Sequence, residues 1–242
     1  MDARPTPEQR ELAEAADRLA LKLGPNAVGD LDDHDRRAKL DAALAQAGWR
    51  ELRAGTRTEP TASGVEAMII TRALARRACD SAYIGPVLAI DLLRRAGDVS
   101  GNGGHTIAVS HDLGQLAVAT GGSLDRSALA IDVSGSEHAL VLVPTGDAFS
   151  LGTAAFGPPA SEEGVDLTRP TSALAAGAAV RPVAGTETLS ADDLTAWTAL
   201  AVTLTAADLV GAMEGALELA TEYAKERRQY GAPIGSYQAV QH

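Results

Sequence analysis

Few side chains in this sequence could act as nucleophiles or metal ligands. Cys79 is the only cysteine, so an intramolecular disulfide and a zinc site built from several thiolates are excluded within one chain. It lies in an alanine- and arginine-rich stretch without a nucleophile signature, which favours an ordinary packed cysteine over a reactive one. No two of the five histidines are four residues apart, the spacing that places two ligands on one helix face. The sequence therefore predicts no metal site.

Four glutamates near the end of the chain could in principle supply a general base. They recur every fourth residue, at Glu214, Glu218, Glu222 and Glu226. On a helix this spacing gives a single stripe, which is more typical of a solvated face than of a catalytic group. We therefore expect a solvated stripe.

Two glycine-rich stretches invite comparison with nucleotide-binding loops. Gly101-Asn102-Gly103-Gly104 and Gly121-Gly122 both lack the G-x-G-x-x-G pattern between a strand and a helix. We interpret both as hairpin turns.

The elements that must position these residues begin with helices. A capping-box pattern starts at Thr6 and another at Ser63, and apolar residues repeat at helical spacing after each. Glycines at 24, 48 and 97 are typical stops. These signals predict four helices, over about 7–23, 35–47, 64–79 and 86–95.

After about Gly101 the spacing of apolar residues is no longer helical. Short β-prone runs at 106–109, 128–133 and 139–143 are separated by Gly, Pro, Ser and Asp, which predicts a small antiparallel β domain. A further capping pattern at Ser190 opens a helix that we expect to continue to about Arg228. On this helix Gly211 and Gly215, with Ala207 and Leu219 on the same face, would let another helix approach closely.

The composition and net charge of the chain limit the kinds of molecule that it can bind. The chain has 45% hydrophobic residues, 3% aromatic residues and a net charge of −11, which opposes binding to nucleic acid or to anionic membranes. The amino terminus lacks a signal-peptide pattern, and no apolar run approaches the roughly 20 residues that span a bilayer. We expect a cytoplasmic protein.

The last 32 residues carry a specific motif. They read GAMEGALELATEYAKERRQYGAPIGSYQAVQH from Gly211 to His242. This run closely resembles the helix-turn-helix of acyl-CoA dehydrogenases, whose approximate pattern is G-x-x-x-x-A-L-x-x-A-x-x-Y-x-x-x-R-x-Q-F-G-x-P-I-x-x-F-Q-x-x-Q-H. The rest of the chain agrees with that family in its order of elements.

The resemblance implies an α+β multidomain fold. Its expected parts are an N-terminal α-helical domain over 1–99, an antiparallel β domain over 100–188, and the first helices of a C-terminal four-helix-bundle domain over 189–242. Because the final residues look like the opening of another helix, we expect the natural domain to continue past His242.

The resemblance also implies an activity. Acyl-CoA dehydrogenases oxidise an acyl-CoA thioester between its α and β carbons. A glutamate removes a proton, FAD accepts a hydride, and a separate electron acceptor reoxidises the flavin. Oligomers are expected, because the Arg-x-Gln-Phe-Gly turn reaches the FAD of a neighbouring subunit.

Five residues are carried over as cofactor-binding candidates. Arg227 would pair with the FAD pyrophosphate, and Gln229 and Tyr230 would border the cofactor. Tyr237 and Gln238 would also line it. An alternative for Arg227 is a structural role, since cations in the last turn of a helix interact favourably with its dipole.

The sequence departs from the family where flavin and base are usually held. Val109–Gly114 replaces the usual T-E-P-x-x-G-S-D loop and keeps only the hydroxyl of Ser110, and no Trp-Ile-Thr follows. The catalytic glutamate lies beyond His242 in most relatives and at about Ala201 in others, and Val202 replaces a frequent arginine. No catalytic residue is therefore assigned to this chain.

These losses resemble the degenerate partner in a heteromeric acyl-CoA dehydrogenase, where one subunit holds flavin and base and the other completes the FAD site. Two alternatives stay open. One is a non-enzymatic assembly or scaffold subunit with the same fold. The other is a homomeric FAD-dependent enzyme with a divergent flavin loop.

Overall fold

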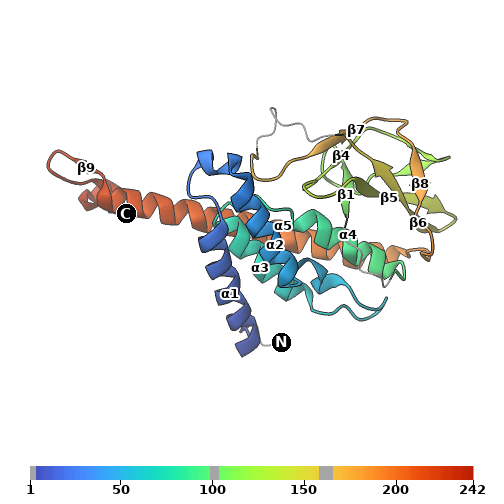
Figure 1. Ribbon diagram of the computed structural model, residues 1–242, viewed down its shortest axis with the longest axis horizontal. Coiled ribbons are helices and arrows are strands. Elements are labelled where there is room, and N and C mark those ends of the chain that lie inside the picture. Colours follow the sequence, from blue (N-terminus) through green and yellow to red (C-terminus); the bar gives the residue numbers. More distant parts are fainter. Residues whose placement is uncertain (1–3, 99–103, 158–165, 242) are drawn as a thin grey trace.

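The computed structural model describes residues 4–98, 104–157 and 166–241 (Figure 1). Four helices form the first layer, in the order α1 (Pro7–Leu23), α2 (His34–Gln46), α3 (Gly64–Arg76) and α4 (Ile84–Arg95), with the 3₁₀ turns η1 (Val28–Asp32) and η2 (Arg50–Arg53) between them. The four predicted helices are confirmed, and the predicted end of the third is three residues too late. That helix stops at Arg76 because Ala78 takes a left-handed backbone conformation, with φ 47°.

Local signals explain where these helices start. The Thr6 hydroxyl accepts a hydrogen bond from the Gln9 amide (3.2 Å), and the Gln9 side chain accepts one from the Thr6 amide (3.1 Å). This reciprocal capping box satisfies two backbone donors that a helix start otherwise leaves unpaired. Ser63 caps α3 through the amide of Val65.

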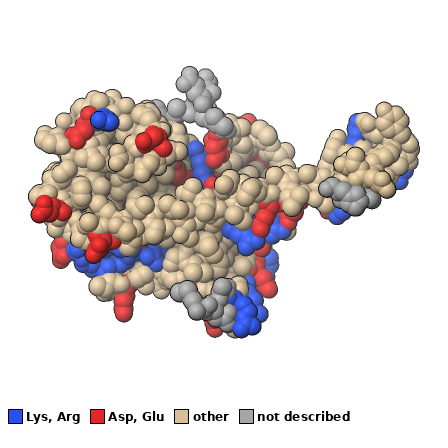
Figure 2. All heavy atoms as spheres, turned by 180° about the vertical axis from the view of Figure 1, so that it is seen from behind, with Lys and Arg blue, Asp and Glu red and all other residues tan. Residues whose placement is uncertain are grey.

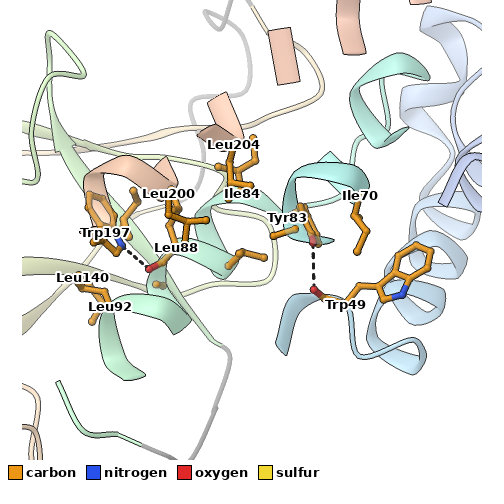
Figure 3. Packing of buried hydrophobic residues seen from close by; sticks show 14 of the residues in the cluster. Trp49, Ile70, Tyr83, Ile84, Leu88, Leu92, Leu140, Trp197, Leu200 and Leu204 are labelled. Atoms are coloured by element: carbon orange, nitrogen blue, oxygen red, sulfur yellow. Dashed lines mark hydrogen bonds between the residues drawn. The ribbon is translucent and has the colours of Figure 1, made fainter. Parts of the chain in front are cut away.

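The main core lies where the helices meet the start of the last long helix (Figure 3). The Trp197 indole donates a hydrogen bond to the Leu88 carbonyl oxygen (2.9 Å), and the Tyr83 hydroxyl donates one to the Trp49 carbonyl oxygen (3.3 Å). Both aromatic rings are buried, so these bonds satisfy polar atoms that would otherwise be buried without partners.

A sheet of six strands forms the second layer, beside α4 (Figure 1). Its strands, in spatial order, are β7 (Ser172–Leu174), β4 (Ala128–Ala130), β1 (His105–Ser110), β5 (His138–Thr145), β6 (Ala148–Ala155) and β8 (Val180–Pro182). Neighbours are antiparallel except β1 and β5, which run parallel with Thr106 opposite Ala139. The predicted sheet is confirmed, but the expectation of purely antiparallel pairing is wrong, because β4 pairs on one side of β1 and the chain crosses to the other side before β5.

A separate hairpin joins β2 (Ala119–Thr120) to β3 (Ser123–Leu124). Its two loop residues, Gly121 and Gly122, have φ values of +60° and +84°. Positive φ at both loop positions is characteristic of a type I′ turn, which favours glycine. The predicted hairpin turn is therefore confirmed here, whereas residues 101–103 of the other glycine-rich stretch lie outside the described residues.

The long helix α5 (Ala191–Glu226) has 36 residues, which corresponds to about 54 Å at 1.5 Å per residue. Ser190 and Asp193 form its capping box, as predicted. It ends two residues before the predicted position and is followed by β9 (Arg228–Gln229), β10 (Ala232–Pro233), η3 (Ile234–Ser236) and α6 (Gln238–Gln241). The boundaries of the three expected domains, at 99/100 and 188/189, stay predictions.

By length and composition alone, α5 could cross a membrane, with a mean hydropathy of 1.4 over its most apolar window. The expectation that no stretch of the sequence meets this criterion is therefore wrong. One face of the helix is nevertheless part of the protein core, through the buried side chains of Trp197, Leu200 and Leu204. Helices that pack in a protein core commonly pass the same test.

Candidate functional site

The segment from Arg227 to Gln238, called the tip below, contains all five predicted cofactor-binding residues. Glu226 is the last helical residue of α5, and Arg227 follows with an extended backbone (φ −65°, ψ 120°). Arg227 is thus the C-cap residue of α5, and its amide still donates to the Tyr223 carbonyl oxygen (2.8 Å), so its alternative role at the negative end of the helix dipole stays a prediction. The tip then forms a hairpin in which Gln229 pairs with Ala232.

The hairpin turns at Tyr230 and Gly231, whose φ values are 50° and 82°. This is again the pattern of a type I′ turn. The hairpin is closed by two hydrogen bonds. The Ile234 amide donates to the Arg227 carbonyl oxygen (2.8 Å), and the Tyr237 hydroxyl donates to the Gln229 carbonyl oxygen (2.9 Å). Tyr237 thus has a structural role within the tip itself.

The five predicted cofactor-binding residues of the tip are all exposed. Tyr230 is 96% exposed and Tyr237 is 38% exposed, and Arg227, Gln229 and Gln238 are also exposed. Among the described residues, none forms an ion pair or a hydrogen bond with the Arg227 guanidinium. A guanidinium in this state can bind a phosphate through two parallel hydrogen bonds.

The tip lies far from the sheet. Figure 2 shows it as a small lobe joined to the body of the protein by the narrow distal part of α5. The tip contacts α5 through η3 and β10, and Gly235 lies against the Ala224 backbone. A ligand at the tip would therefore meet few other residues of this chain.

The loop after β1 is where the flavin loop was expected, and it is closed on itself. The Ser110 hydroxyl donates to Asp112 Oδ1 (2.5 Å), and the Gly114 amide donates to the same oxygen (3.1 Å). The Gln115 amide donates to Ser110 Oγ (3.3 Å). These hydrogen bonds, from Ser110 first, lower the pKa of Asp112, so the loop carries a negative charge. The only retained hydroxyl is therefore engaged beside a carboxylate and does not fit an anionic cofactor.

The glutamate stripe differs from the expectation. The Glu214 carboxylate accepts hydrogen bonds from Nε (2.9 Å) and from Nη2 of Arg72. The Glu218 carboxylate forms ion pairs with Arg76 and with Arg77 (3.3 Å). The first half of the stripe therefore joins α5 to α3 and is not simply solvated. Glu222 pairs within its own helix, with Lys225 (2.6 Å), and Glu226 is exposed.

The predicted close approach of another helix to α5 is confirmed. Gly211 and Gly215 are buried against the Arg72 and Arg76 carbonyl groups of α3. Ala207 is also buried, whereas Leu219, one turn beyond Gly215 on the same face, is 73% exposed. α3 ends at Arg76, beside Gly215, so α5 extends past the end of its neighbour there.

Two polar contacts between the layers were missed by sequence reasoning. Asp132 lies just after β4, with φ 54°, and its Oδ2 accepts hydrogen bonds from the amides of Tyr83 (2.7 Å) and Gly85 (3.1 Å) at the start of α4. Burial raises the pKa of Asp132. Arg169 forms a bidentate pair with Asp208 of α5. A carboxylate within the apolar run 128–133 is the one sequence signal that could have revealed Asp132.

Cys79 is buried and unpaired by disulfide, and burial raises the pKa of its thiol to about 12. The predicted packed cysteine is confirmed.

An open cleft of about 680 Å³ lies between α2 and the sheet, lined by Arg37, Asp41 and residues 133–138 and 155–157. None of the five predicted site residues lines this cleft.

The end of the chain is similar in sequence to known acyl-CoA dehydrogenases. Residues 200–242 match the family described as acyl-CoA dehydrogenase, C-terminal domain. The chain is 55% identical over 42 residues to acyl-CoA dehydrogenase IpdE2 of Mycobacterium tuberculosis, an alignment that covers 17% of this chain and only 13% of that protein.

Solved structures extend the similarity along the chain. The ChsE4-ChsE5 complex from Mycobacterium tuberculosis matches with a TM-score of 0.77 and 22% identity, covering 100% of this chain and 73% of the other. An acyl-CoA dehydrogenase complexed with FAD from Bacillus anthracis matches with a TM-score of 0.67 and 14% identity, covering 98% of this chain and 47% of the other. At these identities the matches establish the fold.

Proposed function

We propose that this chain, which shares the fold of solved acyl-CoA dehydrogenases and whose residues 200–242 match the C-terminal domain of that family, is a subunit of an FAD-dependent acyl-CoA dehydrogenase. In this proposal it works with a catalytic partner subunit and contributes its tip to the cofactor site that the two chains form together. The substrate is an acyl-CoA thioester, and a separate electron acceptor reoxidises the flavin.

The observation that carries the proposal is the exposed Arg227, unpaired within the described part of the chain, at the end of a helix that leaves the body of its own chain. FAD, when bound, supplies the hydride acceptor. Its pyrophosphate is a fitting ligand for a guanidinium that has no ion-pair partner among the described residues of this chain. Tyr230 and Gln229 lie beside Arg227 and would cover adjoining parts of the cofactor.

The closed loop at Ser110–Gln115 supports a division of labour between two chains. Its hydroxyl and amides are used within the turn, and Asp112 adds a negative charge that would repel an anionic cofactor. This chain therefore fits FAD through its tip and not through this loop. That ChsE4-ChsE5 is described as a complex agrees with an assembly of two related subunits.

The proposal is tested by the ratio of bound flavin to protein. The protein is purified alone and after co-expression with the acyl-CoA dehydrogenase-like subunit encoded nearest to it. Flavin that appears only in the co-purified complex supports the proposal, whereas stoichiometric flavin in the lone protein indicates a conventional homomeric enzyme. Flavin in neither sample, with the two chains associated, indicates an assembly subunit without cofactor chemistry.

A further inference from the structure

We propose that the crossing of α3 and α5 positions the tip, and that Glu214 and Glu218 act as positioning residues for the cofactor contact. Their partners on α3 are Arg72 and Arg76. These four residues, with Gly211 and Gly215, are called the lock below. The inference rests on the proposed function, because it assigns the lock a task in presenting Arg227.

The lock begins with backbone contact between the two helices. An ideal Cβ at Gly211 would lie 2.3 Å from the Arg72 carbonyl oxygen, and one at Gly215 would lie 2.1 Å from the Arg76 carbonyl oxygen. Real Cβ atoms do not approach an oxygen so closely, so only glycine allows this crossing. A slip of α5 by one turn would bring Leu219 or Ala207 to a position that admits no side chain.

Ion pairs then fix the rotation of α5 at the crossing. Arg72 donates two hydrogen bonds to Glu214. One helical turn further along α5, Glu218 forms ion pairs with Arg76 and Arg77. A bidentate arginine pair constrains direction as well as distance. Glycine contacts set how closely the helices approach, and the charged pairs set which face of α5 points toward α3.

Beyond the lock, the rest of α5 has no other support among the described residues. Every residue from Leu219 to Glu226 is exposed except the half-buried Ala224, whose backbone contacts the tip. From Gly215 to Glu226 the helix rises about 16 Å. A tilt of about 10° at the lock would therefore move Arg227 by roughly 3 Å, which is enough to break a hydrogen bond.

The test measures the direction of α5 and the retention of FAD separately. Spin labels are placed at Leu21→Cys on α1, where the native side chain is 59% exposed, and at Tyr230→Cys in the tip, where it is 96% exposed. Cys79 is buried and stays unlabelled. FAD retention is measured without labels in the complex with the co-expressed partner.

The lock variant is Glu214→Gln with Glu218→Gln. Its matched control is Glu222→Gln with Glu226→Gln, which also removes two charges from the same stripe; Glu222 pairs with Lys225 of its own helix, and Glu226 is exposed. We expect the lock variant to broaden the distance distribution between the labels and to weaken FAD binding about tenfold, with neither change in the control. The exchange Arg72→Glu with Glu214→Arg should restore both properties relative to Glu214→Arg alone, because the one ion pair that either residue forms among the described residues is the pair between them.

A distance distribution as narrow in the lock variant as in the control would overturn the proposal. FAD binding unchanged by a broadened distribution would overturn it as well. Arg227→Ala separates this inference from the proposed function, since it removes the cofactor contact and leaves the distance distribution unchanged. If Arg227→Ala retains FAD fully, the proposed function fails, whatever the labels report about the lock.

Discussion

The carboxylate of Asp132, at the end of a sheet strand, accepts a hydrogen bond from the backbone amide of Tyr83, just before α4, at 2.7 Å. This contact joins the sheet to the helical layer through a buried group whose second oxygen, Oδ1, has no hydrogen-bond partner among the described residues. A buried helix start and a buried carboxylate thus satisfy each other in part.

Asp132→Ala should therefore destabilise the protein by about 2 kcal/mol, because it leaves the amides of Tyr83 and Gly85 buried without acceptors. Asp132→Asn should cost less, since its carbonyl oxygen can still accept. The measurement is chemical denaturation at neutral pH. Equal stability of the alanine variant and the wild type would contradict the capping role.

The same residue predicts a pH dependence. Since burial raises the pKa of Asp132 in the folded state, the protonated form is favoured by folding. Its stabilising contribution is complete below the ordinary aspartate pKa of about 3.9 and is lost as pH rises toward the folded-state value. The stability of wild type relative to Asp132→Asn should therefore fall as pH increases from about 4. A constant difference between the two proteins would contradict this assignment.

Asp91 should show the opposite behaviour. It is fully buried and binds Arg53 (2.8 Å), Arg94 (2.9 Å) and Arg95 (2.7 Å). Burial alone would raise the pKa of Asp91, but the hydrogen bond from Arg95 and the charge of Arg53 outweigh it and lower the pKa. The stability it contributes should be present above the ordinary aspartate pKa and should be lost as pH falls through the lower folded value.

Replacing Asp91 by Asn should cost about 3–5 kcal/mol, because the arginines around it lose their buried counter-charge. The comparison variant is Asp147→Asn, which removes a carboxylate from the exposed turn between β5 and β6 and should change stability by less than about 0.5 kcal/mol. Urea denaturation measures the free energy of unfolding of both variants and of the wild type. Similar losses for the two would show that Asp91 has no special role.

Gly215→Ala sets two opposing effects against each other. An alanine in a helix interior normally gains about 1 kcal/mol over glycine. Its Cβ would lie 2.1 Å from the Arg76 carbonyl oxygen, and such overpacking typically costs about 1–3 kcal/mol. We expect a net loss in thermal stability. Gly29→Ala, at a site with nothing within 4 Å of the new Cβ, should cause no comparable loss.

Arg227→Ala should reduce flavin retention in the co-expressed complex at least tenfold, because it removes a charge-assisted contact to phosphate. Arg228→Ala is the matched control: it removes the same charge from the neighbouring exposed residue, whose backbone pairs within the hairpin. The readout is flavin absorbance per protein after gel filtration. Equal losses in both variants would indicate a general charge effect and not a specific contact.

Much of this structure was predictable where the determining interactions are local. Capping residues such as Thr6, Ser63 and Ser190 identified the helix starts, and paired glycines identified one hairpin. The tip was found through a contiguous motif. Its turn geometry follows from Gly231 at a position that requires positive φ.

The features that were missed depend on residues distant in sequence. The parallel pairing of β1 with β5 is decided by how the chain crosses the sheet, which the alternation within each strand does not reveal. Likewise, Glu214 has the spacing of a solvated residue and gains its partner Arg72 only when α3 packs on α5. The buried role of Asp132 depends on the start of α4 lying beside the strand end.

Tyr230 adopts a left-handed backbone conformation, with φ 50°, while its side chain is 96% exposed. For a bulky residue that conformation costs about 1–2 kcal/mol, and no packing among the described residues offsets it. Glycine at this position would relieve the strain and make the hairpin more stable in the isolated chain. A tyrosine there lowers the local stability of the hairpin and presents an aromatic ring that no described residue of this chain covers.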